Sequence, residues 1–138
     1  DPVGYIVTNG SARIGVVPDM GMATSLIRER LKGCHALIIE ANHDVEMLRN
    51  SPRPWSLKQR ILGRQGHMSN DQAGELVADV GCSRLACVML AHLSEDCNRP
   101  EVAVHAVRTA LDHAELGHVE VKLTYPDRVS DVIIVEGR

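Results

Sequence analysis

The 138-residue sequence is poor in aromatic side chains: it contains no phenylalanine, and its rings are those of Tyr5, Trp55 and Tyr125. So few rings argue against a surface that stacks successive nucleic acid bases, and they require an aliphatic core. No apolar run is long enough to span a bilayer, and no segment resembles a signal peptide. We therefore expect a cytoplasmic protein that has no membrane partner.

An excess of positive charge is also missing, because 15 basic residues stand against 18 acidic ones and give a net charge of −3. This balance argues against a non-specific nucleic acid binder, although it leaves room for a local basic groove. None of the cysteines forms a CxxC pair, and we expect all of them to be reduced thiols. They are Cys34, Cys82, Cys87 and Cys97.

The length of the chain suits one domain over residues 1–138, and its composition is that of a globular protein. The chain has no initiator methionine, and it opens with Asp1-Pro2 directly before a strand-like segment. We therefore expect it to be a partial domain taken from a longer protein.

Apolar periodicity predicts strands that alternate with helices, which is the pattern of an α/β fold. The first two strands are joined by Asn9-Gly10, a strong hairpin signal, and the helix that follows Ser69 begins with a capping box. The predicted strands are residues 5–8, 12–17, 36–41, 85–91, 119–123 and 132–135. The predicted helices cover about residues 23–31, 44–48, 70–80 and 100–114.

Polar side chains follow three of the predicted strands. Asp19 comes after residues 14–17, Glu40 and His43 lie around the end of residues 36–41, and His92 comes after residues 85–91. If these strands are parallel, Asp19, His43 and His92 emerge at the same edge of the sheet, where α/β proteins place their sites. Ser69 and Asn70 lie at a predicted helix N-terminus, where free backbone N–H groups favour an anion such as phosphate.

Each of these residues, taken alone, also has a purely structural explanation. Asp19 precedes a turn, Ser69 and Asn70 can cap a helix, and a histidine after a buried strand is often a hydrogen-bonded structural residue. A Cys97–His92 nucleophile pair is a further alternative, although no nearby residue clearly orients the histidine. The basic residues at 58, 60 and 64 fit a solvated surface or a contact with a phosphate backbone.

Four segments in order make the pattern more specific. They are Pro18-Asp19-Met20-Gly21, Leu37–Asp44 with its Glu-Ala-Asn-His-Asp end, Gly66-His67-Met68-Ser69-Asn70, and Leu90-Ala91-His92-Leu93-Ser94. Together they resemble the C-terminal half of a metallo-β-lactamase-fold hydrolase of the YycJ/WalJ type, and more distantly ribonuclease Z. The resemblance extends from about residue 4 to about residue 111.

The resemblance implies the roles of individual residues. By its analogy Asp19 bridges two divalent metal ions (zinc or manganese), and His92 binds one of them. His43 and His67 would handle substrate or protons, and Glu40 would support them. Backbone N–H groups near Ser69 and Asn70 would help to hold a bound anion. The implied fold is one sheet with helices on one face, equal to half of the αββα sandwich.

The chain departs from the family in one respect, because the main metal-binding motif His-x-His-x-Asp-His is absent from it. Asp19 and His92 alone cannot hold two metal ions, since zinc sites ordinarily use three or four protein ligands. We therefore expect the parent protein to be a metal-dependent phosphodiesterase or nuclease, and this chain alone to be inactive without the N-terminal half. An uncovered sheet face would also favour self-association. The alternative is a non-catalytic α/β binding or interaction domain.

Overall fold

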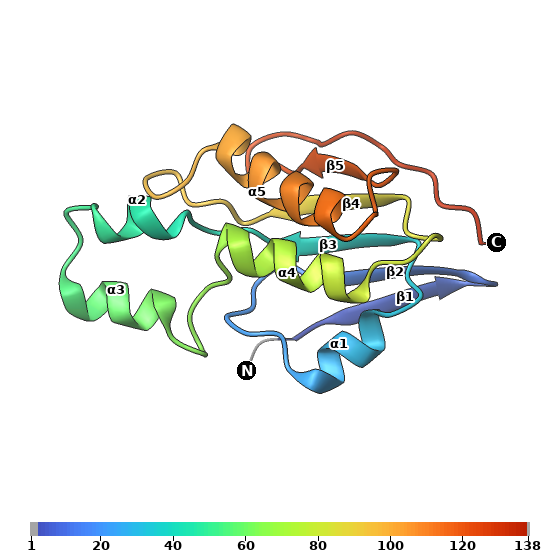
Figure 1. Cartoon of the computed structure of the whole chain (residues 1–138), viewed down its shortest axis with the longest axis horizontal. Helices are drawn as coiled ribbons and strands as arrows, with labels where there is room; N and C mark the ends of the chain where they lie inside the picture. Colours follow the sequence, from blue (N-terminus) through green and yellow to red (C-terminus); the bar gives the residue numbers. More distant parts are fainter. Residues whose placement is uncertain (1–2, 138) are drawn as a thin grey trace.

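The computed structural model describes residues 3–137, so Asp1 and Pro2, with which the chain opens, lie outside the described residues. Its centre is a five-stranded sheet with the strands side by side in sequence order, as Figure 1 shows. The first two strands form an antiparallel hairpin, and each later pair of neighbours is parallel. The strands are β1 (Tyr5–Asn9), β2 (Ala12–Val17), β3 (Ala36–Glu40), β4 (Cys87–Ala91) and β5 (Glu120–Leu123).

Three helices cover one face of this sheet, and two short helices project beyond the carboxyl ends of its parallel strands (Figure 1). The covering helices are α1 (Ser25–Leu31), α4 (Asn70–Val80) and α5 (Pro100–His113). The projecting helices are α2 (Val45–Arg49) and α3 (Trp55–Leu62). None of the helices within residues 3–137 is both long and apolar enough to cross a bilayer.

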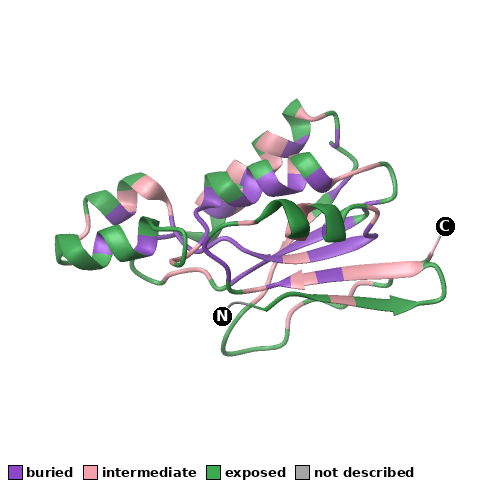
Figure 2. Ribbon diagram, turned by 90° about the horizontal axis from the view of Figure 1, so that it is seen from below, coloured by how far each residue is buried: buried purple, intermediate pink, exposed green. Residues whose placement is uncertain are grey.

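The core forms where α4 and α5 pack on the two central strands. Leu37, Ile39, Val88 and Leu90 alternate along β3 and β4 and are at most 1% exposed. They pack with the buried faces of the two helices, and Figure 2 shows these buried surfaces facing one another. Burial of one such aliphatic side chain is worth roughly 1.5–3 kcal/mol, so this layer fixes the positions of the strand ends.

The structure confirms the α/β class, the hairpin and the caps. Gly10 lies in the β1–β2 turn with a φ of 60°, a conformation that glycine adopts without steric cost. Ser69 and Gln72 form the predicted capping box of α4. All four cysteines are free thiols, as we expected.

Two expectations about secondary structure were wrong or incomplete. The predicted strand over residues 132–135 does not form, because the segment after β5 runs back without regular structure towards the β1–β2 turn, where Gly137 contacts Ser11. Four apolar residues form a strand only beside a partner edge, and this segment pairs with none of the described strands. The basic residues at 58 and 60 lie on helix α3, which the sequence did not predict.

Candidate metal centre

The candidate site lies at the edge of the sheet where three parallel strands end. Asp19 lies two residues after β2, Glu40 is the last residue of β3, and His92 directly follows β4. The strands are parallel and in register, with Glu40 opposite Ala91, so their carboxyl ends meet. His67 reaches the same place from the segment between α3 and α4, just before the cap of α4. The structure therefore brings together four of the predicted site residues.

Glu40 is a fully buried carboxylate that accepts four hydrogen bonds. Its Oε1 atom lies 2.7 Å from His67 Nδ1 and 2.8 Å from His92 Nδ1. Its Oε2 atom accepts from the backbone N–H groups of Met20, at 2.9 Å, and Met68, at 3.1 Å. A carboxylate accepts only, so with all four donors in place each imidazole presents an N–H at Nδ1. Glu40 thus joins the segments after β2, before α4 and after β4.

The same hydrogen bonds decide which ring atoms remain available. Because Nδ1 of His67 and of His92 donates to Glu40, Nε2 is the nitrogen that each ring has left to offer to a ligand. A carboxylate behind a histidine fixes the ring and makes its far nitrogen a better metal ligand. Glu40 is therefore placed as a supporting group behind the two rings, and Asp19 lies beside them.

Asp19 completes the cluster on the solvent side. Its Oδ1 atom lies 3.4 Å from His67 Nδ1 and 4.0 Å from His92 Nδ1. One donor atom from each of the four side chains lies within 4.8 Å of the others, and the two imidazole rings meet edge to face at 5.0 Å. Carboxylate oxygen and imidazole nitrogen are the donors that zinc and manganese accept in proteins. The residues present therefore suit a divalent cation, and they form an incomplete set for two.

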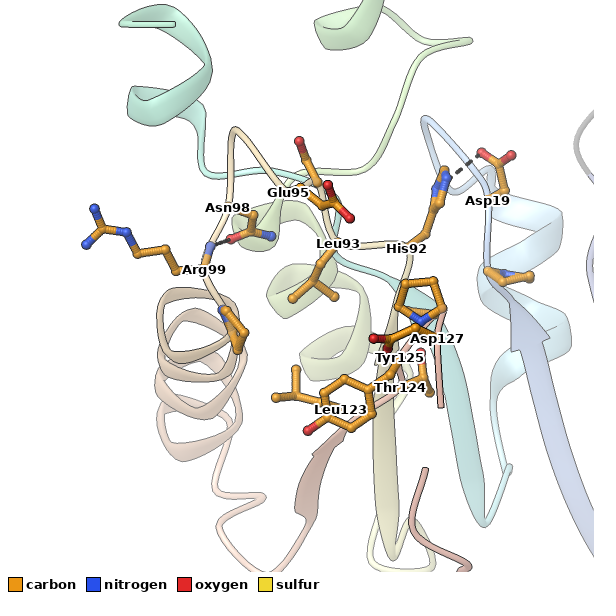
Figure 3. A pocket seen from close by; sticks show the side chains of 15 residues that line it. Asp19, His92, Leu93, Glu95, Asn98, Arg99, Leu123, Thr124, Tyr125 and Asp127 are labelled. Carbon is orange, nitrogen blue, oxygen red and sulfur yellow. Dashed lines mark hydrogen bonds and ion pairs between the residues drawn. The ribbon is translucent and has the colours of Figure 1, made fainter. Parts of the chain in front are cut away.

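The backbone at His92 is held in an unusual conformation. Its φ is 60°, in the left-handed region that costs a residue with a side chain roughly 1–2 kcal/mol. The amide of Asn42 donates to the His92 carbonyl at 2.8 Å and holds the turn in place. Local strain that neighbouring groups maintain is typical of functional sites, and here the His92 ring faces Glu40 and also Asp19, as Figure 3 shows for Asp19.

Ser69 and Asn70, predicted to contact substrate, are both buried and both hydrogen-bonded within the protein. The Ser69 hydroxyl accepts from the Gln72 N–H, which makes it the helix cap. The Asn70 amide forms a reciprocal pair with Asn98 at 2.8 and 2.9 Å, and Asn98 also donates to the Ala41 carbonyl. These hydrogen bonds fix the loops that carry the site, so Ser69 and Asn70 both stabilise the local structure.

His43 is also buried, at 1% exposure, and the four-residue cluster does not include it. Its Nδ1 lies 3.2 Å from Asn42 Oδ1, while its Nε2 is buried and has no hydrogen-bond partner among the described residues. Burial, and secondarily the neighbouring His67, lowers the pKa of His43 to about 4. A catalytic role for His43 stays a prediction.

The structure argues against Cys97 as a nucleophile. Cys97 is 1% exposed and packs with Leu48 and Ile61 in a small second core, so a substrate cannot reach its thiol. His92 Nδ1 faces Glu40 instead.

Two clefts flank the cluster, and both include Asp19 and His92 in their walls. The first, which we call the tail cleft, has a volume of about 620 Å³ and lies between the loop after β4 and residues 123–127 (Figure 3). The second, which we call the basic cleft, has a volume of about 490 Å³ and lies beside α3. His67, Arg53 and Arg60 line only this second cleft. The candidate cluster is thus open to ligands from two sides.

Comparison with known families agrees with this geometry. A model described as the beta-lactamase superfamily domain matches residues 1–92, which include all four residues of the cluster and end at His92. The chain belongs to this superfamily. Its helices and sheet also resemble the metallo-beta-lactamase fold protein YhfI from Bacillus subtilis, with a TM-score of 0.60 over 88% of this chain and 40% of that one. At 16% identity, this likeness concerns the fold. The metallo-β-lactamase resemblance is confirmed.

Sequence relatives in the superfamily are nucleases by name. The chain is 37% identical over 117 residues to exodeoxyribonuclease YycJ of Bacillus anthracis, which covers 85% of this chain and 44% of that protein. It is 35% identical over 102 residues to exodeoxyribonuclease WalJ of Streptococcus pneumoniae, or 74% of this chain and 38% of that protein. The chain therefore spans less than half the length of these curated relatives.

Several residues that hold this superfamily site together give no signal in the sequence. Asn42 and Asn98 carry the hydrogen bonds between its loops, yet single asparagines in loops give no periodic signal. Arg53 follows a proline and precedes another, which marks only a break in helix. Their importance rests on contacts with residues far along the chain.

Proposed function

We propose that this chain provides part of the metal-binding catalytic site of a DNA hydrolase. One observation carries the proposal: Glu40 holds the imidazoles of His67 and His92 through Nδ1, beside Asp19, at the carboxyl ends of three parallel strands. The superfamily membership and the relatives named exodeoxyribonuclease support a phosphodiester substrate. A metal ion bound there would polarise a phosphoryl oxygen and stabilise the charge that develops during attack.

We propose different roles for the four residues of the cluster. Asp19 and His92 would bind metal, as the family resemblance implies, and Asp19 would offer two oxygens to a pair of cations. His67, hydrogen-bonded to Glu40 and half-buried at the edge of the basic cleft, would hold a proton close to the scissile phosphate. Glu40 would fix both rings and take no part in binding substrate.

The donor count limits what this chain achieves alone. Glu40 is occupied by its four donors and His67 would hold a proton, so the cluster offers one carboxylate and one imidazole, whereas a pair of metal ions needs more ligands than that. We propose that residues outside this chain, in the N-terminal half of the fold, complete the set, and that the 138-residue chain has no nuclease activity by itself. Metal-dependent DNA cleavage by the purified chain alone would contradict this.

Metal titration followed by calorimetry tests the site directly. We expect Mn²⁺ or Zn²⁺ to bind the chain weakly, and Asp19→Asn or His92→Gln to weaken binding at least tenfold, which is about 1.4 kcal/mol. Asp127→Asn is the matched control, since Asp127 also lines the tail cleft but lies outside the cluster. An equal loss in the control, or no loss in either site variant, would refute the proposed metal centre.

A further inference from the structure

The two clefts beside the cluster differ in charge although they share Asp19 and His92. The tail cleft carries the carboxylates of Glu95 and Asp127 in addition to Asp19, against the single guanidinium of Arg99. The basic cleft carries the guanidinium groups of Arg53 and Arg60, with Asp19 as its one carboxylate. For a chain with net charge −3, this local excess of positive charge next to the candidate metal centre is a specific feature.

The fold holds in place the backbone segment that carries the two arginines of the basic cleft. Leu48 of α2 and Ile61 of α3 pack with Cys97 in the small second core, which ties both helices to the loop after β4. Lys58 of α3 is buried and donates from Nζ to the Arg49 carbonyl of α2 at 2.6 Å. A side chain at Gly66 would collide with the Ile61 carbonyl, so the chain passes closely behind α3. The α2–α3 segment is therefore a packed extension with fixed surface positions.

This packing leaves Arg53 and Arg60 free to meet an anion. Arg53 contacts Asp96 at 3.5 Å, a long and partly exposed ion pair that contributes little. Arg60 is exposed on α3 and makes no ion pair with the described residues. A guanidinium presents several donors in a plane that match the oxygens of a phosphate, and phosphate contacts position a nucleic acid strand without reading its sequence.

We propose that the basic cleft holds the phosphates of a DNA strand next to the scissile bond, and that Arg53 and Arg60 are the contacts that place the strand there. This proposal rests on the proposed nuclease function, which it deepens by assigning the strand to one of the two clefts. The acidic tail cleft repels a polyanion, so the backbone lies on the side of α3. The two arginines act by positioning the strand, while chemistry stays with the cluster.

Fluorescence anisotropy with a labelled single-stranded oligothymidine, measured with EDTA present, tests the subsite without any metal. We expect Arg53→Gln and Arg60→Gln each to weaken binding about threefold, and the double variant about tenfold. Each single variant should also reduce the slope of log affinity against log salt by about 0.7, the value for one single-strand phosphate contact. Circular dichroism confirms that the variants are folded, and Arg60→Gln alone disturbs no described ion pair.

Two matched controls define what overturns the proposal. Arg64→Gln removes the same charge four residues further on, outside both clefts, and Arg99→Gln removes it from the tail cleft. Losses in either control as large as those of Arg53→Gln and Arg60→Gln would show that only overall charge matters. Unchanged binding in the two cleft variants, or no binding by the wild-type chain, would also overturn the subsite.

A competition with inorganic phosphate distinguishes a strand from a free anion. Millimolar phosphate that displaces the oligonucleotide completely at constant ionic strength would mean that the cleft binds single phosphates, which contradicts a strand contact. Weak competition supports it. The binding assay contains EDTA and so does not depend on metal. A negative result in it would contradict the strand contact but not the metal site at Asp19 and His92, and a negative metal titration would contradict the metal site but not the strand contact.

Discussion

Replacement of Glu40 by glutamine should change the tautomers of two histidines. The carboxylate accepts from two backbone N–H groups through Oε2 and from two imidazoles through Oε1. The side chain of glutamine has one oxygen and one NH₂ group. The N–H groups of Met20 and Met68 can only donate, so the glutamine oxygen must face them, and the NH₂ group must then face the two rings.

An NH₂ group cannot accept a hydrogen bond, and the rings therefore have to respond. His67 and His92 can restore both hydrogen bonds by moving their protons to Nε2, so that Nδ1 becomes an acceptor for the two amide hydrogens. The exchange keeps the number of bonds but replaces charge-assisted ones by neutral ones, which are about half as strong. We expect these weaker bonds to lower the free energy of unfolding by about 1–2 kcal/mol. The loss is no larger because burying a neutral amide costs less than burying a carboxylate.

Metal binding should weaken together with stability. With a proton on Nε2, the His92 ring no longer offers the lone pair of that nitrogen to a cation, and loss of a supporting carboxylate commonly lowers metal affinity 10–100-fold. Long-range ¹H–¹⁵N NMR spectra report the tautomers, calorimetry reports Mn²⁺ affinity, and urea unfolding reports stability. Glu95→Gln, an exposed carboxylate at the neighbouring cleft, is the control. Unchanged tautomers or undiminished Mn²⁺ affinity in Glu40→Gln would refute this account of the site.

Three further outcomes follow from the structure. Burial lowers the pKa of His43 from 6.5 to about 4, so between these pH values the unfolded chain binds a proton that the folded chain does not bind. The free energy of unfolding should therefore fall by about 3 kcal/mol as the pH falls from 6.5 to 4. Urea unfolding should show a weaker pH dependence for His43→Gln over that range. Asn98→Ala leaves the Ala41 carbonyl and the Asn70 amide without partners and should cost about 2–3 kcal/mol in the same assay, whereas a loss below 0.5 kcal/mol would argue against the amide pair. Val132 and Ile134 are 84% and 87% exposed, so we expect the isolated chain to self-associate in sedimentation velocity experiments. The double variant Val132→Ser with Ile134→Ser should self-associate less. A wild-type chain that is monomeric at every concentration would contradict this expectation.

The sheet and the placement of the site residues were predictable because each depends on short-range patterns. Buried parallel strands are continuous apolar runs, and the polar residue that follows each run must emerge where the strand ends. Asp19, His43 and His92 could thus be assigned to one edge before any contact was known, although the cluster that forms there contains Glu40 and not His43. His67 was assigned by its helix-start segment and the family resemblance, since it does not follow a strand.

Helix α3 and the hydrogen bonds of the site could not be predicted in the same way. Ile61 of α3 packs on Leu48 and on Cys97, which is 36 positions further along the chain, so the helix is stabilised by a contact that periodicity does not show. The Asn70–Asn98 pair likewise joins residues 28 positions apart. For Glu40, the sequence indicated a supporting carboxylate, but its four donors come from three separate segments that only the fold brings together.

The origin of those four donors bears on how the site is built. All of them belong to this chain. The contacts that orient His67 and His92 are therefore the same ones that join the strand ends. A preorganised pair of rings lowers the entropy lost on metal binding, since fewer side-chain rotamers remain to be fixed. If residues outside this chain complete the ligand set, as we propose, they would meet imidazoles whose Nδ1 protons already face Glu40.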